Sequence, residues 1–229
     1  MLRDDWGPFQ RHRRKEAQLE TDLQRKQAGV GRPRQMLEDE RRSRLISAVA
    51  ELFLRKGYHA TTVEDVARCA GMSKKTVYQV FSGKSGLFDA LLTDWFAPYT
   101  IPIDSDGRSL EDVLIDALSR QANFALTERQ VAMTRLLIAE APCSEEIVSA
   151  LDRQGLGRGK GALEQWLAAQ AALGVLKIDN AAEASSMLFF TAVGDFLMGL
   201  LLRIRPRPTA EDVHARVKQT VAAFLRQYT

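Results

Sequence analysis

The chain has 229 residues, of which 45% are apolar, so it can bury a hydrophobic core and has room for an ordinary domain plus a small head. No stretch approaches the roughly 20 apolar residues of a membrane-spanning helix, and the N-terminus lacks the apolar segment of a signal peptide, so we expect a cytoplasmic protein with no membrane partner. Residues 1–92 hold 18 Lys and Arg against 12 Asp and Glu, whereas residues 93–229 hold 14 against 17. This uneven charge favours binding of the N-terminal part to a polyanion.

Residues 1–38 form a basic extension that we expect to be largely flexible, because it has few large apolar side chains to bury. Within it, Gly31-Arg32-Pro33-Arg34 resembles the core of an AT-hook. A narrow minor groove has an enhanced negative potential that attracts arginine, so Arg32 and Arg34 are expected to bind DNA there. The alternative is a plain flexible linker.

Two apolar stripes at three- and four-residue steps predict helices at either end of a head that we place at residues 39–99. The first stripe consists of Leu45, Ile46, Val49, Leu52 and Phe53 and is closed by Gly57. The second consists of Leu87, Phe88, Leu91 and Leu92. Residues 88–95 are expected to connect the head to the rest of the chain as one helix.

Between these stripes, residues 61–81 have the pattern of two short helices joined by a tight turn. Thr61 and Glu64 have the spacing of a capping box, which predicts that a helix begins at residue 62. Gly71 can adopt the left-handed conformation that ends this helix, and Ser73 is a favoured N-cap for the next one. The pattern indicates a helix-turn-helix, whose second helix enters the major groove of DNA.

The second helix of this motif should bury Val77, Val80 and Phe81 and expose side chains that donate hydrogen bonds to phosphates and base edges. The residues expected to bind DNA are Ser73, Lys74, Lys75, Thr76, Tyr78 and Gln79, with Thr62 and Lys84 at phosphates near helix N-termini. The alternative is a generic helical hairpin with a solvated basic face.

Residues 43–92 are similar to the DNA-binding domain of the TetR family of transcriptional repressors. The matching motifs are A-E-L-F-x-x-K-G-Y at 50–58, A-T-T-V-x-D-V-A at 60–67 and A-G-M-S-K-x-T-V-Y-x-x-F at 70–81. The sequence departs from the family at Lys75, where many members have Gly, and at Val80, where an aromatic residue or His is frequent. Ser85 and Gly86 replace the usual acidic pair, which should loosen the start of the following helix by up to about 1 kcal/mol.

The body, which we place at residues 105–229, shows a succession of helical patterns and no alternating strand pattern, so the fold is predicted to be all-α. Helices are expected at 110–126, 127–140, from 145, at 163–173, at 181–203 and from 209. Their predicted boundaries include the capping residues Thr127, Asn180 and Thr209 and the stop signals Pro142, Gly174 and Pro206. An all-α head with a helix-turn-helix, followed by a helical body, is therefore the expected fold.

The helix at 181–204 is apolar on more than one face, which is typical of a central helix or of an interface. The resemblance to TetR proteins implies that 181–204 and 209–228 form a four-helix bundle with a second subunit. The implied function is that of a homodimeric repressor that binds a double-stranded DNA operator.

Two further motifs, A-x-x-R-L-L-I-A-E-A at 132–141 and W-L-A-A-Q-A-A-L-G-V-L-K-I-D at 166–179, resemble the C-terminal domain of AefR-like members. This resemblance implies a pocket for a small, often apolar effector molecule. The expected pocket residues are Phe124, Met133, Leu137, Trp166, Met187 and Phe190, and ordinary core packing is the alternative for each.

The sequence shows no arrangement of side chains typical of an enzyme, and neither a cofactor nor a metal ion is expected. The three histidines, His12, His59 and His214, have no metal-ligand spacing. Two other functions stay open: a DNA-binding regulator controlled by a partner protein without a small-molecule switch, and a helical small-molecule-binding protein or enzyme.

Overall fold

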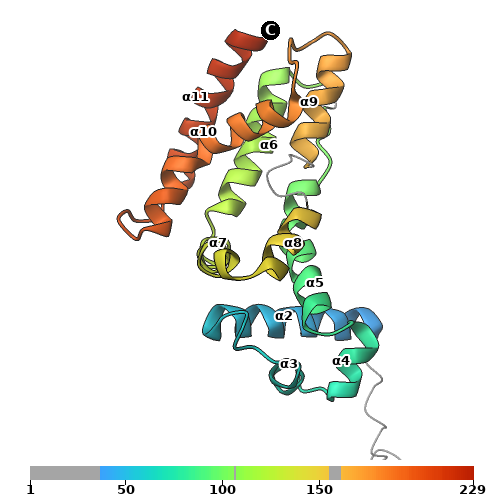
Figure 1. Cartoon of the computed structure of the whole chain (residues 1–229). Coiled ribbons are helices and arrows are strands. Elements are labelled where there is room, and N and C mark those ends of the chain that lie inside the picture. Colours follow the sequence, from blue (N-terminus) through green and yellow to red (C-terminus); the bar gives the residue numbers. More distant parts are fainter. Residues whose placement is uncertain (1–36, 106, 155–160) are drawn as a thin grey trace, which may run out of the picture. The chain divides into compact units, whose positions relative to one another are not determined.

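The computed structural model describes residues 37–105, 107–154 and 161–229, and this part of the chain contains helices but no strand (Figure 1). The prediction of an all-α fold is therefore confirmed. By its internal contacts the chain divides into two units, Met1–Arg41 and Arg42–Thr229. Of the first unit, only Leu37–Arg41 belongs to the described residues, so Arg32 and Arg34 lie outside them.

Four helices occupy the head: α2 (Glu38–Lys56), α3 (Val63–Cys69), α4 (Lys74–Val80) and α5 (Lys84–Phe96). Their core is aromatic, because the ring of Tyr58 lies 5.2 Å from that of Phe53 and 4.9 Å from that of Phe88. Val77 of α4 is fully buried against the same core. The two apolar stripes predicted from the sequence thus pack in one core, and α3 and α4 contribute side chains to the same core.

The start of α3 differs from the prediction by one residue. The N-cap is Thr62, whose Oγ1 accepts a hydrogen bond from the N–H of Asp65, while the Asp65 carboxylate accepts one from the N–H of Thr62. Thr61 is 2% exposed, and its hydroxyl donates to the carbonyl oxygen of Gly57 instead. Hydrogen bonds from Lys56 and from Thr62 hold the pKa of Asp65 well below its usual range.

The body contains α6 (Leu110–Ala125), α7 (Glu128–Glu140), α8 (Glu145–Gln154), α9 (Ala162–Ala172), α10 (Ala181–Leu201) and α11 (Ala210–Tyr228). Two short 3-10 helices, η1 (Ala97–Thr100) and η2 (Ala141–Cys143), follow α5 and α7. Helix α11 packs on α6, and α10 packs on α6, α7, α9 and α11 (Figure 1). This packing encloses a second core, centred on Leu114, Leu118 and Leu188.

Helix α10 ends at Leu201, two residues before the predicted end. Arg203 has a φ of 57°, the left-handed conformation that closes many helices and that usually requires glycine. The backbone N–H of Ile204 then donates to the carbonyl oxygen of Gly199, at 3.0 Å. The helix therefore stops through a C-terminal turn, before Pro206 can act.

By length and composition alone, α10 is long and apolar enough to cross a membrane, which corrects the expectation that no stretch approaches such a span. Glu183 and Asp195 interrupt this apolar run, so the sequence has no unbroken apolar stretch of that length. Core helices of soluble proteins pass the same test, and one face of α10 packs within the body. Helix α10 is therefore an apolar helix that packs on the body and also keeps apolar side chains exposed.

Candidate functional site

Helix α4 presents a rigid polar face because both of its ends are fixed by local chemistry. Gly71 has a φ of 67°, as predicted for the turn between the two helices. The Ser73 hydroxyl accepts a hydrogen bond from the N–H of Thr76 at 3.0 Å, which confirms the predicted N-cap. Phe81 is buried beneath the guanidinium of Arg42, which lies 4.9 Å from the ring centroid.

The outward face of α4 carries Lys74, Lys75, Tyr78 and Gln79, all of them exposed. Tyr78 is 51% exposed, which is high for so large an aromatic ring in a folded domain. Lys74 forms an ion pair with Glu64 and lies 5.9 Å from the Tyr78 ring centroid. The face is therefore suited to hydrogen bonding and stacking by Tyr78, Gln79 and Lys75.

Thr62 and Lys84 already have partners within the protein. The Thr62 side chain caps α3, as described above. The Lys84 ammonium donates to the carbonyl oxygen of His59 at 3.2 Å and lies 4.2 Å from the ring centroid of Tyr58, and burial lowers its pKa. The exposed side chains of α4 are thus freer to bind a polyanion than these two.

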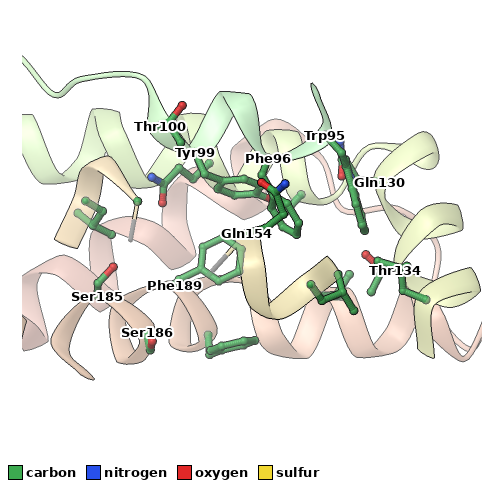
Figure 2. A pocket seen from close by; sticks show the side chains of 18 of the residues that line it. Trp95, Phe96, Tyr99, Thr100, Gln130, Thr134, Gln154, Ser185, Ser186 and Phe189 are labelled. Atoms are coloured by element: carbon green, nitrogen blue, oxygen red, sulfur yellow. The ribbon is translucent and has the colours of Figure 1, made fainter. Parts of the chain in front are cut away.

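A cavity of about 550 Å³ lies in the body (Figure 2). Its walls come from α5 and η1, from α6, α7, α8 and α10, and from the start of α9. Five aromatic side chains line it: Trp95, Phe96, Tyr99, Phe189 and Phe190. This size and lining are typical of sites that bind drug-sized molecules.

The described polar side chains that line the cavity are neutral. Among the described residues, the polar side chains that line it are Thr100, Gln121, Gln130, Thr134, Gln154, Ser185 and Ser186, and none that line it is charged. Burial raises the pKa of Tyr99, so its phenol is neutral as well. The Gln154 amide donates to the hydroxyl of Thr93 on α5 at 3.1 Å. The cavity can therefore supply neutral hydrogen bonds and aromatic contact.

Of the six residues expected in a pocket, Leu137 and Phe190 line this cavity. The other four lie elsewhere among the described residues: Phe124 and Met133 pack in or against the head core, Trp166 lies in the body core, and Met187 is exposed on α10. The Trp166 indole N–H donates to the hydroxyl of Ser105 at 3.1 Å, and Trp166 is not among the residues that line the cavity.

The sequence reasoning missed Trp95, Phe96 and Tyr99. These rings cluster where α5 leaves the head, with centroids 5.1 Å apart for the first pair and 6.3 Å apart for the second. A run of aromatic residues at the end of the connecting helix was the available signal. The same helix therefore begins at Lys84, shortly after α4 in the sequence, and ends in the cavity wall.

The last residue of α7, Glu140, links the cavity wall to the head. Its carboxylate accepts a hydrogen bond from the backbone N–H of Tyr58 at 3.3 Å and lies 3.7 Å from Nε2 of His59. Helix α7 also lines the cavity through Thr134 and Leu137. A shift of α7 at the cavity would therefore move the Glu140 carboxylate and change its contacts with the loop between α2 and α3.

We expect Gly57→Ala to lower the free energy of unfolding by about 2 kcal/mol. Gly57 has a φ of 84°, which costs a residue with a Cβ about 1 kcal/mol. The new Cβ would also overlap Oε1 of Glu140, so that carboxylate must move and lose its hydrogen bond to Tyr58. Gly71→Ala is the matched control, because its φ is also positive but no atom lies within 4 Å. Urea denaturation giving equal losses for the two variants would contradict the Glu140 contact.

No group of His, Cys, Asp and Glu side chains suited to a metal ion occurs among the described residues. Cys69 and Cys143 are both exposed free thiols in this part of the chain. The candidate sites are the exposed face of α4 and the cavity in the body.

Two family models match the chain. Residues 45–91 match the model described as bacterial regulatory proteins, tetR family. Residues 112–229 match the model described as AefR-like transcriptional repressor, C-terminal domain. The first covers the helix-turn-helix, and the second covers more than half of the chain.

Individual relatives agree with these models. The transcriptional regulator HbdR of Aromatoleum sp. is 26% identical over 215 residues, covering 84% of this chain and 93% of that protein. The transcriptional activator FasR of Mycolicibacterium smegmatis is 42% identical over 64 residues, 28% of this chain. The chain spans 29% of the length of FasR. It spans 58% and 50% of the lengths of two other curated relatives. Among solved structures, the flavonoid-responsive regulator FrrA superposes with a TM-score of 0.68 at 22% identity, covering 82% of this chain and 97% of FrrA, which shows a common fold.

Proposed function

Because the chain belongs to the tetR family of bacterial regulatory proteins, we propose that it is a homodimeric repressor that a small molecule releases from a palindromic operator. The observation that carries this proposal is the course of α5. This helix begins at Lys84, shortly after α4 in the sequence, and ends in the wall of the 550 Å³ cavity. One chain thus joins a surface for DNA to a site for an effector.

The proposed DNA contacts are centred on Lys75, Tyr78 and Gln79. Lys74, Thr76 and Ser73 lie on the same short helix, and Lys74 is expected to exchange Glu64 for a phosphate. The two α4 helices of a dimer would enter successive major grooves at half-sites about 34 Å apart, or a multiple of that distance. We propose that the backbone N–H groups at the starts of α3 and α5, near Thr62 and Lys84, bind the flanking phosphates.

The proposed dimer forms through 181–204 and 209–228. On and just after α10 the exposed apolar side chains are Met187, Phe190, Met198, Leu202 and Ile204. A soluble monomer rarely leaves so many large apolar groups in one stretch, and a second copy would cover them. Gly194 has no atom within 4 Å of an added Cβ, so a partner helix can approach the backbone there.

A small-molecule switch is favoured over control by a partner protein, because the cavity is large, aromatic and contacted by α5 and α7. The name of FrrA describes it as flavonoid-responsive, which supports an aromatic effector here. FasR carries the name of an activator, whereas BdcR of Escherichia coli carries that of a repressor, and we favour repression. Such a protein acts in the cytoplasm.

Selection of bound DNA from a random pool tests this proposal. The expected result is an inverted repeat with half-sites separated by one or more helical turns. A gel-shift titration of that site should show one complex with two copies of the chain. Recovery of no common sequence, or of a sequence without symmetry, would contradict a dimeric operator-binding protein.

A further inference from the structure

We infer that Glu140 positions the loop between α2 and α3, residues 57–62, and thereby carries a change at the cavity to α3 and α5, the helices on either side of α4. This inference rests on the proposed function, since it names the residue through which the cavity acts on operator binding. Glu140 is a positioning residue in this scheme, because it contacts neither the DNA nor the effector.

The part of α7 that lines the cavity is fixed to α10 by Arg135. Thr134, the preceding residue, lies in the cavity wall (Figure 2). The Arg135 guanidinium donates hydrogen bonds to the carbonyl oxygens of Leu200 at 2.9 Å and Leu201 at 3.1 Å, at the end of α10. Hydrogen bonds from a charged donor are about twice as strong as neutral ones. A molecule that pushes on this wall should therefore displace the end of α7 that carries Glu140 more than the part that Arg135 holds.

Glu140 contacts three consecutive residues of the loop. Its carboxylate accepts a hydrogen bond from the backbone N–H of Tyr58 at 3.3 Å and lies 3.7 Å from Nε2 of His59. The carboxylate also lies so close to Gly57 that a Cβ at that position would overlap Oε1. The Glu140 side chain is only 19% exposed, so water competes little for these contacts.

Apolar packing between α7 and the head does not fix the loop in the same way. Met133 and Leu137 of α7 are buried in the head core. The hydrophobic effect has no direction, so such contacts tolerate small shifts of one helix over another. A hydrogen bond depends on the distance and angle between two particular atoms. Glu140 is thus the contact that sets the place of the loop relative to α7.

The same loop is bonded to the starts of α3 and α5. The ammonium of Lys84, the first residue of α5, donates to the carbonyl oxygen of His59 at 3.2 Å. The Thr61 hydroxyl donates to the carbonyl oxygen of Gly57 at 2.8 Å, and the next residue, Thr62, is the N-cap of α3. Helix α3 packs on α4, the helix that we propose enters the major groove. A displacement of the loop should therefore change how α4 is presented to DNA.

A double-mutant cycle on operator affinity tests this inference without an effector molecule. Thr134→Trp places an indole ring in the cavity as a substitute for a ligand. It should weaken binding of the operator recovered from the random pool about tenfold, within the usual range of coupling between two sites. In a Glu140→Ala background the same substitution should weaken binding less than about twofold. Fluorescence anisotropy with labelled operator measures both ratios.

Two further backgrounds assign the effect to the Glu140 carboxylate. Glu140→Gln keeps an oxygen that can accept from the Tyr58 N–H, so it should restore most of the tenfold effect of Thr134→Trp. Glu128→Ala is the matched control, because Glu128 is an exposed glutamate at the other end of α7 and is not among the residues that line the cavity. It should leave the effect at about tenfold. A purely structural role of Glu140 would change operator affinity equally with and without Thr134→Trp, so the ratio separates the two roles.

Hydrogen exchange on the free chain follows the loop directly and needs no DNA. The Tyr58 N–H loses its acceptor in Glu140→Ala, so peptides that cover residues 57–62 should exchange about fivefold faster, the worth of one ordinary hydrogen bond. Thr134→Trp should accelerate exchange of the same peptides, whereas Glu128→Ala should leave it unchanged. Ile138→Trp, at an exposed lining position of α7, takes the place of Thr134→Trp if that variant does not fold.

Three outcomes would overturn the inference. The first is a cavity-filling substitution that leaves operator affinity unchanged. The second is an equal effect of that substitution with and without Glu140→Ala, which would assign the coupling to α5. The third is unchanged exchange of residues 57–62 in Glu140→Ala. If the random pool yields no operator, the proposed function fails, and the exchange rates still decide whether the cavity is linked to the loop.

Discussion

Replacing Met198 with glutamate is expected to dissociate the dimer. Met198 is 55% exposed on the face of α10 that we propose meets the second subunit. By twofold symmetry two carboxylates would enter one apolar interface, and an uncompensated buried charge costs about 3–5 kcal/mol. Light scattering at micromolar concentration should then give the 25.6 kDa of a single chain. Operator affinity should fall with it, because a monomer reads only one half-site.

The matched control is Leu173→Glu. Leu173 is 73% exposed just after α9, so the same kind of substitution is made outside α10 and α11. This variant should remain a dimer. Leu197, by contrast, is a poor site for the charge, because it lines the cavity and packs against the body core. A Met198→Glu protein that stays dimeric would place the interface elsewhere.

The head could be predicted from the sequence in detail because its helix ends depend on local chemistry. Gly71 and Ser73 act through their own backbone conformation and their own hydroxyl, so their roles can be read without knowing the fold. The start of α3 could not, since Thr61 and Thr62 both stand three residues before an acidic side chain. A tertiary contact decides between them: Thr61 turns inward to the carbonyl oxygen of Gly57.

The cavity was only partly predictable because core and cavity residues have the same spacing and composition. Met133 and Leu137 lie four residues apart on α7, yet only Leu137 lines the cavity. Gln130, on the same helix, lies three residues after the N-cap Thr127, and this spacing indicates a capping role and not a place in a cavity wall. Its burial in the cavity wall is a property of the packed structure, which the spacing of the sequence does not reveal.

Tyr78→Ala is expected to weaken operator binding by about 1–3 kcal/mol, or about 5- to 150-fold. The ring projects from the centre of α4, is 51% exposed and has no role in the head core, so its loss should leave the fold intact. If Tyr78 contacts bases, the affinity for random DNA should change much less than that for the operator.

Lys75→Ala provides the contrast that separates base contacts from phosphate contacts. A lysine that neutralises one phosphate contributes about 0.9 to the slope of log affinity against log salt, so this variant should flatten the slope. Tyr78→Ala should lower the affinity and leave the slope unchanged. Tyr78→Phe, which keeps the ring, should recover the share of affinity that comes from stacking and apolar contact. Gel-shift titrations at several salt concentrations measure all three. If Tyr78→Ala lost equal affinity for operator and random DNA, the Tyr78 side chain would contact the DNA backbone and not the bases.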